Sequence, residues 1–156
     1  MAHPNEEVKT VPVTDDNSES LSAFWKLGRD YLSDLPTNER ERFLQSILAR
    51  RGEPDRWLLL LRHGIEYIGL VHLKIDRDER PGWGFILEFY IVSNMRRLGW
   101  GRRLFDIIVK ILQNRGVKNI WLLTDPAAKV FWLSLGFRGT SEIDKETGQE
   151  IMVKPI

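Results

Sequence analysis

The stretch that decides the fold reads Ile91-Val92-Ser93-Asn94-Met95-Arg96-Arg97-Leu98-Gly99-Trp100-Gly101-Arg102-Arg103. An apolar strand pattern leads into it, and helical apolar spacing follows it from Leu104. The two glycines lie where the helix begins, so a ligand could approach the backbone closely there. Unpaired N–H groups and the positive end of the helix dipole favour an anion at such a point, and four arginines in eight positions add attraction. Together these features would suit a pyrophosphate group.

The spacing fits neither of two common phosphate-binding motifs. A Gly-Lys-Ser/Thr sequence is missing, and the third glycine of a Gly-x-Gly-x-x-Gly pattern would fall at Leu104. The same residues would also be expected in a helix that simply begins at flexible glycines and exposes its arginines to solvent, without any ligand. From the spacing alone, both interpretations stay open.

The chain before this stretch predicts a strand, two helices and three strands. Helical spacing starts at Leu21 and stops before Pro36, and Thr37 or Asn38 would cap the second helix. Apolar runs separated by polar turns predict the strands. The expected segments are a strand with Val8, Val11 and Val13, a helix over Leu21–Leu35, a second helix with Phe43, Leu44, Ile47 and Leu48 on its apolar stripe, and strands at Trp57–Leu61, Ile65–Ile75 and Gly84–Val92, with turns at Asp15–Asn17 and Arg62–Gly64 and a polar loop at Asp76–Pro81.

The chain after it alternates helix and strand. A mostly buried helix is followed by the Leu/Ile/Trp-rich strand Asn119–Thr124, which is typical of a parallel sheet. Asp125 and Pro126 would start a short helix as capping carboxylate and first-turn proline. Phe137–Asp144 and Glu150–Lys154 predict a closing hairpin. We therefore expect an α/β or α+β fold with a mixed, mostly antiparallel sheet of six to seven strands and about four helices.

Composition limits the function classes. The 156 residues are 42% hydrophobic, which suits one domain over residues 8–156 after a flexible tail at residues 1–7. A formal net charge of +1 does not support a general nucleic-acid binder. The chain has no cysteine, which excludes disulfides and thiolate ligands. No apolar run is long enough to span a bilayer, so we expect a cytoplasmic protein without membrane contact.

Two motifs resemble the GNAT superfamily of acetyl-CoA-dependent N-acetyltransferases. Arg96-x-x-Gly99-x-Gly101 matches that family's Arg/Gln-x-x-Gly-x-Gly/Ala signature, and Ile91 stands where its fourth strand ends. Ala128–Phe137 resembles its second block, Ala-x-x-Phe-Tyr-x-x-x-Gly-Phe. The resemblance implies a GNAT-like single domain with parallel, splayed fourth and fifth strands. It also implies transfer of an acetyl group from acetyl-CoA to a primary amine by direct attack.

The resemblance further implies which residues bind acetyl-CoA as cosubstrate. Backbone groups at the end of the fourth strand would pair with the pantetheine arm. Backbone N–H groups at the helix start, supported by a guanidinium, would meet the pyrophosphate. The implied cofactor-binding residues are Ile91, Val92, Ser93, Arg96, Arg97, Leu98, Gly99, Trp100, Gly101, Arg102 and, in the second block, Lys129 and Trp132.

Catalysis by this route needs a base for the amine proton. Glu88 is the only acid in the apolar strand Phe85–Val92, where the family often carries such a base; the alternative is an edge glutamate paired with a lysine or arginine. Trp132 replaces the tyrosine that often serves as acid, and an indole cannot protonate a thiolate. We therefore interpret Trp132 as a packed aromatic, with water or Tyr90 as the acid. A thiol pKa of about 8.5 still makes thiolate a tolerable leaving group.

Other residues give weaker signals. The histidines His3, His63 and His72 lack metal-ligand spacing, so we expect no metal site. His72 is interpreted as a half-buried strand histidine rather than as a lining residue of the acceptor cleft. Aromatic residues on the first helix, Tyr31 among them, are interpreted as core rather than as substrate wall.

The partners and two other functions stay open at this point. The acceptor would be a small molecule, a peptide or a protein, and a homodimer is one possible assembly. A non-catalytic acyl-CoA-binding or regulatory module is an alternative that the missing tyrosine favours. An RNA-directed member that uses the arginines is another, and the near-neutral charge argues against it and against nucleic acid as a partner.

Overall fold

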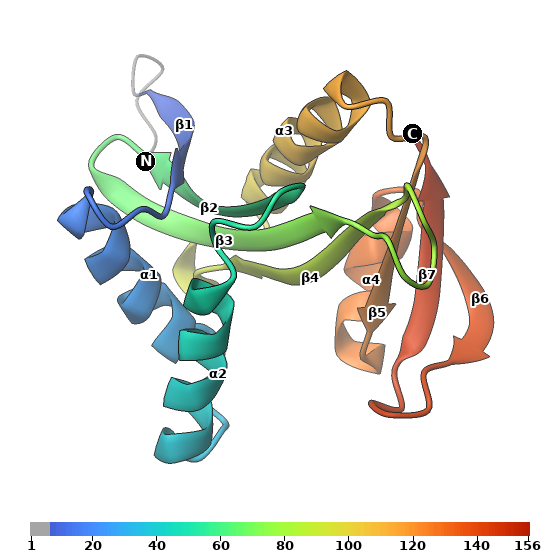
Figure 1. The fold of residues 1–156 in the computed structure, drawn as a ribbon, viewed down its shortest axis with the longest axis horizontal. Helices are drawn as coiled ribbons and strands as arrows, with labels where there is room; N and C mark the ends of the chain where they lie inside the picture. The colour runs from blue at the N-terminus through green and yellow to red at the C-terminus, as the bar shows by residue number, and fades with distance from the viewer. Residues whose placement is uncertain (1–6) are drawn as a thin grey trace. The chain divides into compact units, whose positions relative to one another are not determined.

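The computed structural model describes residues 7–156, so most of the tail predicted at residues 1–7 lies outside the described residues. Twelve elements follow one another in this part of the chain (Figure 1). They are β1 (Val8–Pro12), α1 (Ser18–Tyr31), α2 (Thr37–Ala49), β2 (Arg56–His63), β3 (Glu66–Ile75), β4 (Gly84–Ile91), the 3-10 helix η1 (Ser93–Met95), α3 (Trp100–Asn114), β5 (Asn119–Thr124), α4 (Pro126–Ser134), β6 (Arg138–Ile143) and β7 (Glu150–Pro155).

The strands form one mixed sheet in the order β1-β2-β3-β4-β5-β7-β6. β1 pairs with β2, and β7 with both β5 and β6, in antiparallel fashion. β4 and β5 are parallel, and their ladder joins Gly84–Ile86 to Ile120–Leu122, while β4 continues to Ile91. The seven strands, the four α-helices and the parallel central pair confirm the predicted fold class.

The chain divides into two compact units, and β3 and β4 run through both. The first unit holds the residues up to His72 together with Glu88–Leu104. The second holds Leu73–Leu87 together with Phe105–Ile156.

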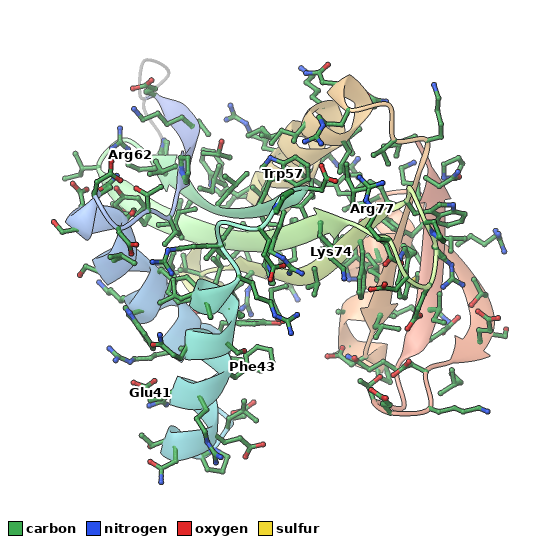
Figure 2. The ribbon with its side chains drawn as sticks, in the orientation of Figure 1. Glu41, Phe43, Trp57, Arg62, Lys74 and Arg77 are labelled. Carbon is green, nitrogen blue, oxygen red and sulfur yellow. The ribbon has the colours of Figure 1, made fainter. Side chains whose placement is uncertain are left out.

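In the first unit, α1 and α2 pack beside the strands through their apolar stripes. Gly28 of α1 permits close approach, because a Cβ there would lie 2.5 Å from a methyl of Leu44 on α2. Phe43, predicted on the α2 stripe, is instead 40% exposed, and Figure 2 shows it with Glu41 on α2. The buried residues of this core are Val11, Val13, Phe24, Leu27, Leu44, Ile47, Leu48, Leu58, Leu60, Leu70 and Tyr90.

Both helix starts in this unit differ from the prediction. Asn17, read as part of a turn, caps α1 by accepting from the backbone N–H of Ser20 at 3.1 Å, so the helix begins before Leu21. Pro36 occupies the N-cap of α2 with no side-chain hydrogen bond, so the predicted cap at Thr37 or Asn38 is wrong. Its fixed φ suits the residue that leads into a helix, and Thr37 becomes the first helical residue.

Two predicted boundaries were also wrong. α1 ends at Tyr31 rather than Leu35, because a residue before proline is disfavoured in helical conformation and the segment after Tyr31 forms turns. β2 continues through His63, where a turn was predicted. Pairing of Arg62 and His63 with β1 extends the strand, and the turn moves to Gly64, whose φ is 60°.

The second unit agrees more closely with the prediction. Asp125 caps α4 by accepting from the N–H of Ala128 at 2.8 Å, and Pro126 is the first helical residue. β5 spans the predicted residues, and β6 and β7 form the predicted hairpin. In the loop that follows β3, the buried Asp76 accepts from the N–H groups of Asp78 and Arg80 and from the indole of Trp121 at 3.2 Å.

None of the helices described in residues 7–156 is both long enough and apolar enough to cross a membrane.

Candidate functional site

The passage from β4 to α3 is shaped by two residues with left-handed backbone conformation. Arg97 has φ 62° and Gly99 has φ 87°. The carbonyl of Gly99 accepts the first helical hydrogen bond, from the N–H of Arg103 at 3.0 Å, so Gly99 is the N-cap residue of α3, which begins at Trp100. The N–H groups at the first helical positions, Trp100 and Gly101, therefore have no acceptor within the helix.

Space is open at the point where this helix begins. A Cβ added to Gly99 would meet no atom within 4 Å. Arg97 and Leu98 are exposed, whereas the Trp100 side chain is buried between the His63 ring, 4.7 Å away, and the Arg103 guanidinium, 5.0 Å away. The ring of Trp100 thus anchors the start of α3, and only the backbone of this residue faces the open space. The region can accept an anion at the helix start.

Arg96 is held by the protein itself. Its Nε donates to the carbonyl oxygen of Ile91 at 2.9 Å, and its guanidinium lies 5.4 Å from the centre of the Tyr90 ring. The side chain therefore folds back onto β4. Its sequence-derived role beside a pyrophosphate stays a prediction.

The backbone N–H and C=O groups at the end of β4 point toward two different edges of the strand. The N–H of Val92 donates to the carbonyl of Ile68 on β3 at 2.9 Å, so that group is used within the sheet. Because successive residues of a strand point their backbone groups in opposite directions, Ile91 presents its own to the edge away from β3. Its carbonyl keeps a second lone pair beside the bond from Arg96. Of Ile91 and Val92, both expected to pair with pantetheine, Ile91 is the one whose backbone groups point away from β3.

Glu88 lies three residues before the end of β4. It is half-buried, and its Oε2 accepts a hydrogen bond from the hydroxyl of Tyr31, the last residue of α1, at 2.5 Å. Burial raises the pKa of Glu88 from 4.5 to about 7, against the opposing effect of the Tyr31 hydrogen bond. The partner of Glu88 is thus a tyrosine rather than the lysine or arginine of the alternative interpretation. A carboxyl of this kind can gain or lose a proton near neutral pH.

Tyr90 lies on the same face of β4, two residues further on, and its hydroxyl donates to Asp30 of α1. Burial, and then the hydrogen bond and charge of Asp30, raise the pKa of Tyr90 to about 12. The hydroxyl proton is therefore held tightly. The sequence-derived role of Tyr90 as an acid remains a prediction.

Lys129 and Trp132, the remaining predicted cofactor residues, belong to the second unit. Lys129 pairs with Glu150, with Nζ to Oε1 at 2.7 Å. Trp132 is buried, and its ring packs against those of Phe105, Phe131 and Phe137 at centroid distances of 6.4, 4.9 and 5.3 Å. The interpretation of Trp132 as a packed aromatic is confirmed.

His72 is a buried strand residue on β3 rather than half-buried as predicted. Its Nε2 lies 2.8 Å from a guanidinium nitrogen of Arg56. A guanidinium only donates, so Nε2 is the acceptor and carries no proton. Among residues 7–156, no three histidine, aspartate or glutamate side chains are grouped so as to hold a metal ion.

Sequence reasoning missed two residues of this site. Asp30 was not singled out, and Tyr31 was interpreted as core, yet both make hydrogen bonds to β4. The one local indication is that Asp30 and Tyr31 both place a polar group at the end of a helix whose other face is apolar. Nothing local indicates a partner 57 or 60 residues away.

The sequence model of the Acetyltransferase (GNAT) family matches residues 18–137, which include α1, Glu88 and the whole passage from β4 to α3. This chain belongs to the GNAT family. No curated protein sequence matches the chain significantly. The GNAT signature thus lies on the turn where Gly99 adopts its left-handed conformation and α3 begins.

Solved structures of several acetyltransferases share the fold. An acetyltransferase from Thermus thermophilus is 22% identical, with a TM-score of 0.75 over 96% of this chain and 97% of that one. The PaiA N-acetyltransferase of Thermoplasma acidophilum, solved with coenzyme A, is 17% identical, with a TM-score of 0.73 over 96% and 99%. The ribosomal-protein-S18-alanine N-acetyltransferase of Escherichia coli is 17% identical, with a TM-score of 0.71 over 96% and 94%.

Proposed function

We propose that this GNAT protein transfers an acetyl group from acetyl-CoA to a primary amine by direct attack. One observation carries the proposal. A single passage of chain, from β4 into α3, holds both a desolvated carboxylate, Glu88, and a helix start that is open to an anion. An amine acetyltransferase needs these two features together, one for the amine proton and the other for the nucleotide end of its donor.

The residues present fit acetyl-CoA. The open space at Gly99 and the backbone N–H groups from Arg97 to Arg102 would receive the pyrophosphate, with the exposed Arg97 adding charge. The backbone groups of Ile91 that point away from β3 would pair with the pantetheine arm. The bound donor supplies a thioester carbonyl that an amine can attack.

Glu88 would act as the general base. In the described part of the chain its Oε1 has no hydrogen bond, whereas Oε2 is bound by Tyr31. The amine nitrogen attacks the thioester carbon, a C–N bond forms and the C–S bond breaks. The amine proton passes to Glu88, water protonates the thiolate, and the hydroxide that remains takes the proton from Glu88, so the products are an amide and coenzyme A. A positioned base contributes about 10²–10⁴-fold to the rate.

A non-catalytic acyl-CoA-binding module is the second candidate. The buried Trp132 favours it, because an indole in this place cannot supply the proton that a thiolate needs. Turnover with any amine separates the two candidates. The cytoplasmic location, the homodimer and the kind of amine stay predictions.

The first experiment is a calorimetric titration of the full chain with acetyl-CoA. We expect micromolar affinity, about −8 kcal/mol. Gly101→Glu should abolish binding by bulk and charge. Gly52→Glu is the matched control, because Gly52 is exposed and a Cβ there meets no atom within 4 Å. No binding at millimolar acetyl-CoA, or equal binding by both variants, would contradict the proposal.

The second experiment follows thiol release with three acceptors: a small primary amine, a short peptide with a free N-terminus and a peptide with only a lysine amine. Glu88→Gln should lower kcat by about 10²–10⁴-fold while leaving the affinity for acetyl-CoA unchanged. Binding without turnover in all three cases would support the non-catalytic module instead.

A further inference from the structure

The Tyr31–Glu88 hydrogen bond joins two elements that are far apart in sequence. Tyr31 ends α1, and Glu88 lies on β4, 57 residues later. The oxygen-to-oxygen distance of 2.5 Å is at the short end for a hydroxyl bound to a carboxylate, as expected for a charge-assisted bond. The hydroxyl reaches only one of the two carboxylate oxygens.

A second contact fixes the Tyr31 ring. It lies 5.3 Å from the Tyr90 ring at an interplanar angle of 48°. The Tyr90 hydroxyl in turn donates to Asp30, the neighbour of Tyr31 on α1. Two adjacent residues of α1 therefore bond to two alternate residues of β4, and the two hydrogen bonds run in opposite senses. Such a pair of contacts limits how far the Tyr31 ring, and with it the hydroxyl oxygen, can move.

Few other charged groups face Glu88 from the elements of this unit. On α1 the neighbouring charge is Asp30, which is bonded to Tyr90. The bond from Val92 to Ile68 sets the pairing of β4 with β3, and counting along an unbroken ladder brings His72 beside Glu88. His72 accepts from Arg56 of β2, and Arg56 pairs with Glu53. Tyr31 is thus the group that bonds the carboxylate of Glu88.

We infer that Tyr31 is a positioning residue for Glu88: its hydroxyl holds the carboxylate by Oε2 and stabilises the charged form, which leaves Oε1 to receive the amine proton. The inference deepens the proposed function and rests on it for the catalytic readout. Without the hydroxyl, the carboxylate is equally buried but has lost its donor. It then holds its proton to higher pH, and a smaller fraction is available as base near neutrality.

The test uses Tyr31→Phe, which removes the hydroxyl and retains the ring that packs on Tyr90. Tyr67→Phe is the matched control, because Tyr67 also donates to a glutamate, Glu19, at 3.0 Å, but at an exposed position. Carbon-13 NMR of labelled glutamate side chains in the full chain reports the titration of Glu88, assigned with Glu88→Gln. We expect its midpoint near pH 7, shifted up by about one unit in Tyr31→Phe and unmoved in Tyr67→Phe.

A second readout follows the same shift in activity. The acidic limb of kcat/KM against pH should move up by about one unit in Tyr31→Phe, so that its deficit is about tenfold at pH 6 and smaller at pH 9. A purely structural role would lower activity by the same factor at every pH. If the protein turns over no amine, the proposed function fails, while the NMR titration still tests the inference.

A third measurement needs no substitution. In a sample with labelled tyrosine ζ-carbons, the Tyr31 signal should shift at the Glu88 midpoint, while the Tyr67 signal should not. An unchanged Glu88 midpoint in folded Tyr31→Phe, or a Tyr31 signal that ignores the Glu88 titration, overturns the inference.

Discussion

Arg96 donates from Nε to the carbonyl oxygen of Ile91, and this bond of 2.9 Å ties the loop before α3 to the end of β4. The same guanidinium lies over the ring of Tyr90, whose hydroxyl donates to Asp30. A continuous series of contacts therefore connects α1, β4 and the start of α3 within the first unit. Arg96, the arginine of the GNAT signature, thus has a structural role that is separate from any contact with a ligand.

Removal of this bond should lower stability. Arg96→Gln loses the bond to Ile91 and the contact with Tyr90, together about 1–2 kcal/mol in the free energy of unfolding. Arg97→Gln is the control, since it removes the same charge and no hydrogen bond of the described chain involves the Arg97 side chain. Urea denaturation of both variants measures the difference. Equal stabilities would show that the bond to Ile91 contributes nothing.

The raised pKa of Glu88 predicts a pH-dependent stability difference. Because burial raises the folded pKa from 4.5 to about 7, the folded chain binds more protons than the unfolded chain between these values. The contribution of Glu88 to stability is then fully present below pH 4.5 and is lost as pH rises through 7. Relative to Glu88→Gln, the wild type should lose about 1–3 kcal/mol over this range.

Urea denaturation of the wild type and Glu88→Gln at pH 5, 6, 7 and 8 measures this difference. Glu19→Gln serves as the surface control and should run parallel to the wild type. A Glu88→Gln difference that does not change with pH would mean that Glu88 titrates like a solvated carboxylate.

Gly99 should be required for its conformation rather than for space. A Cβ would meet no atom within 4 Å, but φ is 87°, a conformation that costs a residue with a side chain about 1–2 kcal/mol. Gly99→Ala should therefore be destabilised by that amount in urea denaturation. Gly52→Ala, with the same open space but without a positive φ, should show no such loss. Equal effects would refute the conformational explanation.

Trp132 should not be replaceable by the tyrosine that is frequent in this family. Trp132→Tyr leaves a gap among Phe105, Phe131 and Phe137 and adds a hydroxyl to a buried site, so we expect a loss of about 2 kcal/mol. Trp132→Phe leaves a similar gap without the hydroxyl and separates the two effects. Thermal unfolding measures stability, and thiol release measures turnover. A rise in kcat for Trp132→Tyr alone would show instead that the position is open to the reaction.

Local signals were sufficient where an element depends on its own residues. The Asp125-Pro126 pair marked the start of α4, and the apolar run Asn119–Thr124 marked β5. They were insufficient where distant segments decide a boundary. β2 extends through His63 because β1, more than 50 residues earlier in the chain, pairs with it. The cap at Asn17 was missed because two preceding aspartates made the same segment resemble a turn.

The candidate site divides in the same way. Glu88 could be found as an isolated acid in an apolar strand, and the glycines as a break between strand and helix. The hydrogen bonds of Tyr31 and Asp30 to β4 had no local signal, because they depend on how α1 packs against the sheet.

The sequence by itself determined the order of elements, the family and the strand–turn–helix passage with its glycines, because these depend on apolar periodicity and on backbone conformations that few residues adopt. Only the tertiary structure decided the chemical state of the site. The pKa of Glu88 is set by burial and by a hydroxyl from another element. The hydrogen bonds of the Ile91 and Val92 backbone groups are made with Arg96 and with β3. Desolvation and hydrogen bonding act through space, so they arise only when distant segments are brought together.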